Sequence, residues 1–130
     1  MKRRRGERAS DVLVGVDVVL VGLFSAKDRE VDAKLDLLAA SVEALGGQVV
    51  GRHVQRRGVS HGGVRKMALP FSRRTLLSPG KVREVAEACR SDRVAAAVFL
   101  NPLTGHQRTV LGDMFDCLVL SSDDLIEHRV

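Results

Sequence analysis

The stretch Val18 to Phe24, with the sequence VVLVGLF, decides the fold class of this chain. It is apolar at every position except its glycine, and three of its residues are β-branched valines. An unbroken apolar run of this length is typical of a strand buried on both faces, and such strands occur mainly in parallel sheets covered by helices. Residues 11–16 either add an edge strand or lead into this one.

A helix is predicted directly after this strand, over Asp28 to Leu45. Asp28 can cap its first turn by accepting a backbone N–H, and Gly46-Gly47 supplies the left-handed turn that ends a helix. Its apolar residues recur three or four positions apart and therefore share one face. They are Val31, Leu35, Leu38, Val42 and Leu45.

Three further strands and three further helices complete the pattern. The strands are predicted over residues 48–54, 94–100 and 117–120. The helices begin at Ser78-Pro79, at the capping-box residue Thr104, and at Ser121-Ser122. Strands that alternate with helices favour parallel pairing. We therefore expect an α/β fold with a mostly parallel four-stranded sheet and helices on both faces, in a single domain.

Residues 48–54 are predicted as a strand, in which successive side chains lie on opposite sides. The period of two places one set on one side of the strand and the other set opposite. The first set is Val49, Gly51 and His53, and the second is Val50, Arg52 and Val54.

Basic residues gather in two segments of this 130-residue chain, whose net charge is +5. Residues 1–10 are predicted to be a disordered basic tail, and residues 11–130 the α/β domain, with a long basic loop at residues 55–77. Seven basic residues and no acidic one fall within residues 52–74: Arg52, Arg56, Arg57, Arg65, Lys66, Arg73 and Arg74. Such a segment either meets a polyanion or is a solvated surface. We favour the polyanion, because like charges repel one another unless a counter-charge is supplied.

Several classes of protein are excluded by what the sequence lacks. It has no GxxxxGK[ST] motif, which excludes a self-contained P-loop GTPase, and no GxGxxG, CxxC or HExxH motif. We therefore expect no cofactor and no metal, and we expect Cys89 and Cys117 to be free thiols. With no Trp or Tyr, an aromatic platform for RNA is also excluded. No apolar run reaches the length of a membrane span and no signal peptide is apparent, so we expect no membrane and a cytoplasmic protein.

Polar side chains follow the predicted strands, where ligands bind in open parallel sheets. For a small enzyme, the candidate catalytic residues are His53, Asn101 and His106, with Arg56 as an anion clamp and Gln55 beside it. The backbone N–H groups at Ser78-Pro79-Gly80-Lys81 form a natural anion site. The same residues also have plain structural explanations, as core histidines, helix caps and surface charges.

Four stretches resemble the N-terminal domain of HflX-type ribosome-associated GTPases, over residues 18–127. Leu20 to Leu23 is similar to that family's first strand, and Val49 to Arg57 to its second strand with the Gln-Arg-Arg that follows. Thr75 to Val85 resembles its Tyr-Ile-Gly-x-Gly-Lys segment, with Ser78 in place of the first glycine. Asn101 to Arg108 stands where the family has an acidic-Leu-Ser-Pro-x-Gln stretch.

The resemblance implies a binding module and not a GTPase. The chain ends where the family continues into a helical hairpin and a GTPase domain, so GTP hydrolysis is not carried over. What is implied is contact with the large ribosomal subunit or its rRNA, and a separate GTPase chain as a further partner. Combined with the charge pattern, the phosphate- or RNA-binding positions are Arg52, Gln55, Arg56, Arg57, Arg73, Arg74, Ser78, Gly80, Lys81 and Gln107.

Three hypotheses follow from these observations. The first is a non-catalytic module that docks on the ribosome, on RNA or on a translation-related partner through the basic loop. The second is a small enzyme or anionic-ligand-binding protein with a pocket at the carboxyl ends of the strands. The third is a protein-interaction domain that forms a homodimer through exposed sheet edges.

Overall fold

The computed structural model describes residues 12–57 and 74–127. The predicted tail at residues 1–10 and the middle of the predicted loop, with Arg73, lie outside the described residues. The elements are β1 (Asp17–Ser25), α2 (Val31–Ala44), β2 (Gln48–Arg57), α4 (Pro79–Ser91), β3 (Ala96–Phe99), α5 (Gly105–Phe115), β4 (Leu118–Ser121) and α6 (Ser122–Glu127). The predicted order of strands and helices is confirmed.

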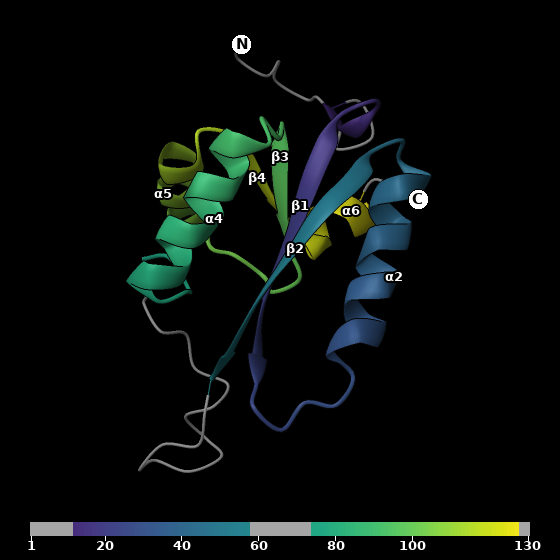
Figure 1. Ribbon diagram of the computed structural model, residues 1–130. Helices are drawn as coiled ribbons and strands as arrows, with labels where there is room; N and C mark the ends of the chain where they lie inside the picture. Colours follow the sequence, from purple (N-terminus) through teal and green to yellow (C-terminus); the bar gives the residue numbers. More distant parts are fainter. Residues whose placement is uncertain (1–11, 58–73, 128–130) are drawn as a thin grey trace.

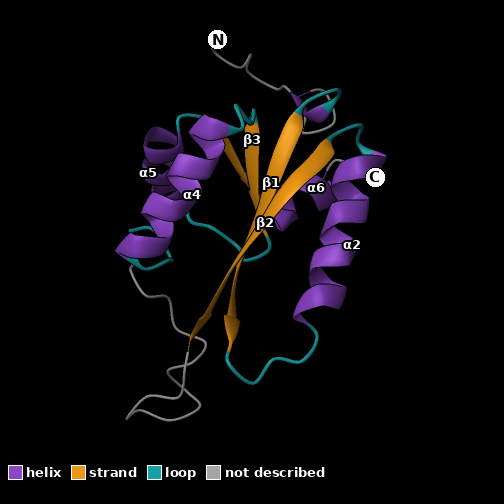
Figure 2. Cartoon of the chain, viewed as in Figure 1, coloured by secondary structure: helices purple, strands orange, loops and turns teal. Residues whose placement is uncertain are grey.

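The four strands form one parallel sheet in the order β2-β1-β3-β4. Helices α4 and α5 cover one face of this sheet, and α2 and α6 cover the other (Figure 1 and Figure 2). The predicted α/β class is therefore confirmed. The chain turns from β1 outward to β2, then crosses back to β3, so the connections leaving β1 and β3 run to opposite faces. This point of divergence is where open α/β sheets usually bind ligands.

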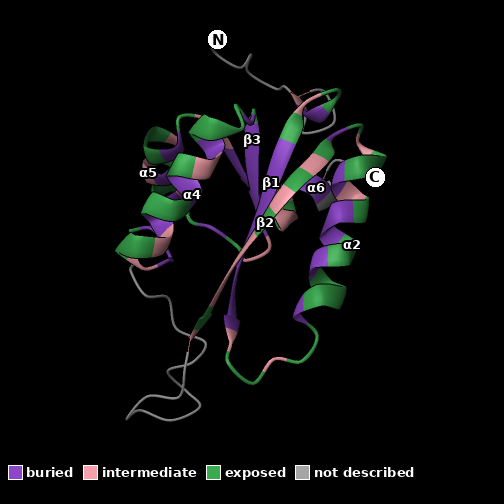
Figure 3. Cartoon of the chain, viewed as in Figure 1, coloured by how far each residue is buried: buried purple, intermediate pink, exposed green. Residues whose placement is uncertain are grey.

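Strand β1 contributes side chains to two apolar cores, one on each face of the sheet. Val19, Val21 and Leu23 pack on the side of α4 and α5, whereas the even-numbered residues pack on the side of α2 and α6. Figure 3 shows β1 buried along most of its length. A Cβ at Gly22 would lie 2.6 Å from the ring of Phe24, so the ring would have to shift if a larger residue replaced this glycine. The expectation of a strand buried on both faces is thus confirmed.

Strand β2 contains a bulge that the sequence pattern does not reveal. Val18 pairs with Val49, but Val19 pairs with Gly51, so one extra residue is inserted in β2. A bulge reverses the alternation that follows it. Val49 therefore packs on the α2 side, while His53 lies on the α4 side, 3.5 Å from Glu84. The prediction that Val49 and His53 share one side was wrong.

Two predicted boundaries also need correction. Helix α2 begins at Val31 and not at Asp28, because Asp28 caps a separate turn by accepting from the backbone N–H of Glu30. The predicted loop at 55–77 is wrong at its first end, because its first three residues continue β2, which pairs with β1 as far as Arg57. At its other described end, residues 74–77 form turns and bends as predicted, although Leu76 and Leu77 are buried in the core.

Residues 12–16, the described residues before β1, add no strand to the sheet. Residues 12–15 form a helical turn, and the side chain of Leu13 is fully buried in the α2-side core. Val14, its neighbour in the same turn, is 64% exposed. The turn therefore closes the amino-terminal end of the α2-side core.

Replacing Leu13 with alanine should destabilise the fold by about 2–4 kcal/mol, because it removes a fully buried side chain and leaves a cavity. Val14→Ala is the matched control and should change stability by less than about 0.5 kcal/mol. Urea unfolding followed by circular dichroism measures both. Equal effects of the two substitutions would contradict the assignment of this turn to the core.

Candidate functional site

The β1–β2 pair extends well beyond the other two strands at the carboxyl edge of the sheet. β1 and β2 have nine and ten residues, whereas β3 and β4 have four each. In Figure 1 the pair forms a ribbon that reaches past the end of β3, with the β1–α2 loop (residues 26–30) at its tip.

Arg56 holds the β1–α2 loop in place. It faces Phe24 in the register of the sheet, and its Nη1 donates to the backbone oxygens of Ser25, Ala26 and Asp28 at 3.3, 3.2 and 2.9 Å. Its Nε and Nη2 donate to none of the described residues. One edge of the guanidinium thus shapes the loop, and the remaining donors can still bind an anion.

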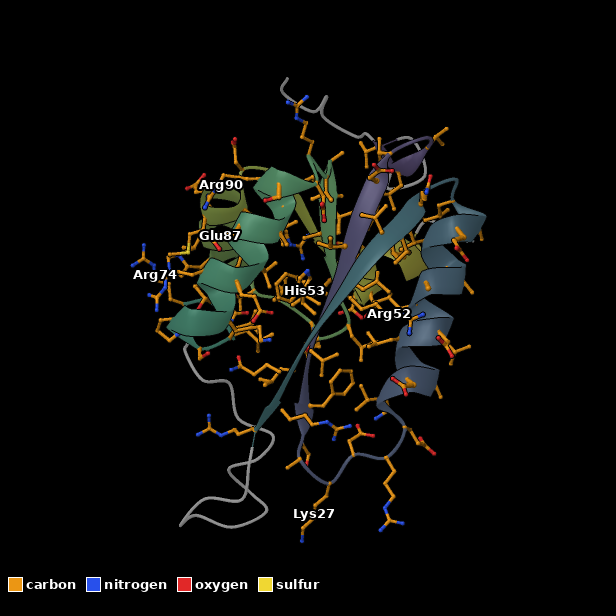
Figure 4. The ribbon with its side chains drawn as sticks, in the orientation of Figure 1. Lys27, Arg52, His53, Arg74, Glu87 and Arg90 are labelled. Carbon is orange, nitrogen blue, oxygen red and sulfur yellow. The ribbon has the colours of Figure 1, made fainter. Side chains whose placement is uncertain are left out.

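The loop and Arg56 enclose an open basic hollow of about 870 Å³, here called the basin. It is lined by Ala26, Lys27, Asp28, Arg29 and Arg56. Figure 4 shows Lys27 pointing away from the body of the protein. Lys27, Arg29 and Arg56 form no ion pair with any residue within 12–57 or 74–127. The basin therefore presents three cationic side chains, of which Lys27 and Arg29 lack a carboxylate partner in the described part of the chain, while the charge of Arg56 also acts on Asp28.

The acid in the basin is already neutralised by a lysine. Asp28 accepts from Lys34 Nζ at 2.7 Å through Oδ2 and from the backbone N–H of Glu30 at 2.8 Å through Oδ1. The hydrogen bond from Lys34, followed by that from Glu30, lowers the pKa of Asp28 below its ordinary value. Asp28 is therefore a carboxylate at neutral pH, and it does not cancel the charge of Lys27 and Arg29.

A second hollow of about 280 Å³, here called the crevice, lies where β1 and β3 diverge. Its walls come from the end of β1, from the β3–α5 connection, and from two residues of the Asp28–Lys34 ion pair. They are Leu23, Phe24, Ser25, Asp28, Lys34, Leu76, Leu100, Asn101 and Pro102. Asp28 thus borders both the crevice and the basin.

Asn101 joins the two strands at the bottom of the crevice. Its Oδ1 accepts from Leu23 N at 2.9 Å, and its Nδ2 donates to Leu23 O at 3.0 Å. The side-chain amide therefore continues the backbone ladder of β1 and β3, which ends with Leu100 N donating to Val21 O. Both groups of this amide are committed to the fold, which leaves little for the role of an orienting amide in catalysis.

The end of β2 and the start of α4 are brought together, as predicted, by an amide and a hydroxyl. Gln55 Nε2 donates to Ser78 Oγ at 2.7 Å, and Ser78 N donates to Gln55 Oε1 at 2.9 Å. Ser78 also caps α4, accepting from Lys81 N at 3.3 Å. The predicted proximity of these two segments is correct, but Gln55 and Ser78 satisfy each other.

His53 lies within the same α4-side group. Its Nδ1 is 3.5 Å from Glu84 Oε2, which also accepts from Lys81 Nζ at 2.9 Å. The hydrogen bond from Lys81 is the main cause that lowers the pKa of Glu84. Figure 4 shows His53 on the α4 side of β2 and Arg52 on the α2 side. His53 therefore contacts a surface ion pair and does not reach the crevice residues Asn101 or Asp28.

The other predicted site residues are spread over the molecule. Arg52 donates to Asp36 of α2 at 2.7 Å, and Gln107 closes the predicted capping box with Thr104. His106 and Gly80 are exposed on the first turns of two different helices, and a Cβ at Gly80 would meet nothing within 4 Å. Of the remaining two described positions, Arg57 ends β2 and Arg74 is exposed before α4.

Among the polar residues that line the basin and the crevice, sequence patterns pointed to Arg56 and Asn101 but not to Arg29 or Lys34. Arg29 and Lys34 were not singled out, and Asp28 was expected only as a helix cap. The Asp28–Lys34 spacing of six residues carries no helical signal, since the pair forms only because Asp28 lies in a turn before α2. A signal was present in Lys27 and Arg29, two cations directly after a buried strand.

Three other properties of the described residues bear on the site. They contain no group of three or more His, Cys, Asp or Glu side chains suited to holding a metal ion. None of their helices combines the length and apolar character needed to cross a lipid bilayer. Cys89 and Cys117 are free thiols, as predicted, although Cys117 is only partly buried.

Comparison with known proteins adds no relative to these observations. The chain matches no protein-family model, and no curated protein is significantly similar to it. The geometry of the basin and the crevice therefore carries the functional argument.

Replacing Asn101 with alanine should destabilise the fold by about 2–4 kcal/mol, because the N–H and the C=O of buried Leu23 would both lose their partners. Asn101→Asp should also be destabilising, since a carboxylate cannot donate to Leu23 O. Gln48→Ala, at an exposed amide side chain, is the control and should be near neutral. Chemical denaturation measures all three. Unchanged stability of the alanine variant would refute the structural role of Asn101.

Proposed function

We propose that this chain is a non-catalytic RNA-binding module that docks on ribosomal RNA of the large subunit. The observation that carries the proposal is the basin, where Lys27 and Arg29 lie on the β1–α2 loop beside Arg56 and form no salt bridge with a carboxylate among the described residues. Arginine and lysine side chains on such a loop contact phosphates, which position a nucleic acid without reading its sequence.

The electrostatics around the basin support a polyanion over a small anion. The basin is open and shallow, with no buried cation that would enclose a single phosphate. In the sequence, β2 leads directly into residues 58–73, which add Arg65, Lys66 and Arg73 without an acid. Six or so phosphate contacts give a log–log salt slope of magnitude roughly 4–5 for single-stranded or irregular RNA.

The choice of ribosomal RNA rests on the resemblance to the N-terminal domain of HflX-type GTPases. Such a module would act in the cytoplasm beside a separate GTPase chain. A non-catalytic role is supported by the contacts of the candidate catalytic residues. Asn101 is committed to Leu23 and His53 lies beside Glu84, so these two side chains do not converge on a common substrate position.

The double substitution Lys27→Ala/Arg29→Ala should weaken binding to a mixed-sequence single-stranded RNA and to large-subunit rRNA. Loss of two phosphate contacts should reduce the magnitude of the salt slope by about 1.4. Filter binding at several salt concentrations measures both quantities.

The matched control is Arg83→Ala/Arg90→Ala, which removes two exposed cations from α4 and leaves the same net charge. This variant should retain the wild-type slope. Equal losses in both double variants would show that only net charge matters, and the basin would then have no special role. Absence of salt-dependent binding by the wild type would overturn the proposed function.

A further inference from the structure

We infer that the crevice between β1 and β3 takes a single unstacked guanine base of the bound RNA, while the adjoining phosphate lies in the basin. This inference rests on the proposed function and names what the site would read. It starts from the juxtaposition of two hollows of different character. The basin is polar and basic, the crevice is largely apolar, and Asp28 borders both.

The size of the crevice suits a small group. Its volume of about 280 Å³ is just below the range of roughly 300–1,000 Å³ typical of pockets for whole drug-sized ligands. A single base is a group of this size. Because the basin is open, the rest of the RNA strand can continue over the surface.

The walls of the crevice suit the faces of a base. Leu23, Leu76, Leu100 and Pro102 provide aliphatic surface in its lining. The chain has no Trp or Tyr to form a stacking platform, so aliphatic walls would have to exclude water from the base. Sequence-specific RNA recognition commonly uses such splayed-out bases and reads their Watson–Crick edges.

The polar groups of the crevice match the edge of guanine. Lys34 has three N–H donors and uses one for Asp28, whereas each Asp28 oxygen has accepted one hydrogen bond and can accept another. The site thus offers a donor beside two acceptors. Guanine presents the complement in the same order, with O6 accepting and N1–H and N2–H₂ donating. Adenine and cytosine place an amino donor where guanine has O6, which would face the Lys34 ammonium.

The geometry of the Asp28–Lys34 ion pair holds the donor and the acceptors in position before RNA binds. The Asp28 side chain is only 16% exposed and is fixed by two hydrogen bonds, while that of Lys34 is 44% exposed and retains freedom to turn toward a ligand. A fixed acceptor reduces the entropy lost on binding. Arg56 adds to this order by holding the loop that carries Asp28.

The test compares C-rich RNA decamers that carry one central guanine, adenine or inosine. The wild type should bind the guanine decamer roughly tenfold more tightly than the adenine decamer, the factor expected from one hydrogen bond to a charged group. Inosine lacks the N2 amino group and should fall between them. This arm uses the unaltered protein and does not depend on any variant folding.

Asp28→Asn should abolish the preference for guanine, because an amide cannot accept two hydrogen bonds side by side. Asp36→Asn is the matched control, since it neutralises another ion-paired carboxylate near α2, outside the crevice. It should keep the preference. Thermal unfolding of both variants checks that the fold is intact.

A titration with guanosine monophosphate, followed by amide chemical shifts, separates the two proposals. Perturbation at Asp28, Lys34 and Leu100 without any RNA binding would support the crevice and overturn the RNA function. Equal, salt-dependent affinity for all three decamers would overturn the guanine site and leave RNA binding in place. A preference that survives in Asp28→Asn would overturn the assigned role of Asp28.

Discussion

The structure depends on how β1 is shared between two cores and then parts from β3. Both faces of β1 are covered by helices, so its backbone must find all its partners within the sheet. The short β3 supplies hydrogen-bond partners for the β1 backbone only as far as Val21. The side chain of Asn101 supplies the partners at Leu23. This substitution of an amide side chain for a strand lets β1 continue past β3. The protruding ribbon and both hollows follow from it.

In the same geometry, two arginines of β2 make structural contacts although they lie at the surface. Arg52 and Arg56 both lie on the α2-facing side of the β1–β2 ribbon, because alternate residues of a strand share a face. Arg52 pairs with Asp36, and Arg56 binds three loop carbonyls. The guanidinium of Arg56, which the sequence predicts as a phosphate ligand, thus holds the β1–α2 loop in place. Its action fixes the backbone from which Lys27 and Arg29 project.

Sequence patterns predicted the parts of this fold that depend on burial and on local capping. The apolar run of β1, the helix face from Val31 to Val42, and the caps at Ser78 and Thr104 all appear as expected. The bulge that follows Val49 could not be predicted, because the sequence shows the same alternation of side chains before and after the inserted residue. The Asp28–Lys34 and Asn101–Leu23 contacts depend on where elements end, which local propensity does not determine. The candidate site is built mostly from such contacts, so only its place at the carboxyl edge was predictable.

A protein with few aromatic residues can still distinguish one base from another, provided that it confines the base and does not stack it on an open platform. A platform gains binding energy from every base and therefore discriminates weakly. A narrow crevice with fixed polar groups penalises a mismatched base, because a buried charge that faces the wrong edge loses its hydration without a replacement. In this protein, Asp28 and Lys34 would impose that penalty, while the basin supplies affinity that is independent of sequence. Specificity and affinity would thus arise from two adjoining hollows that meet at a single carboxylate.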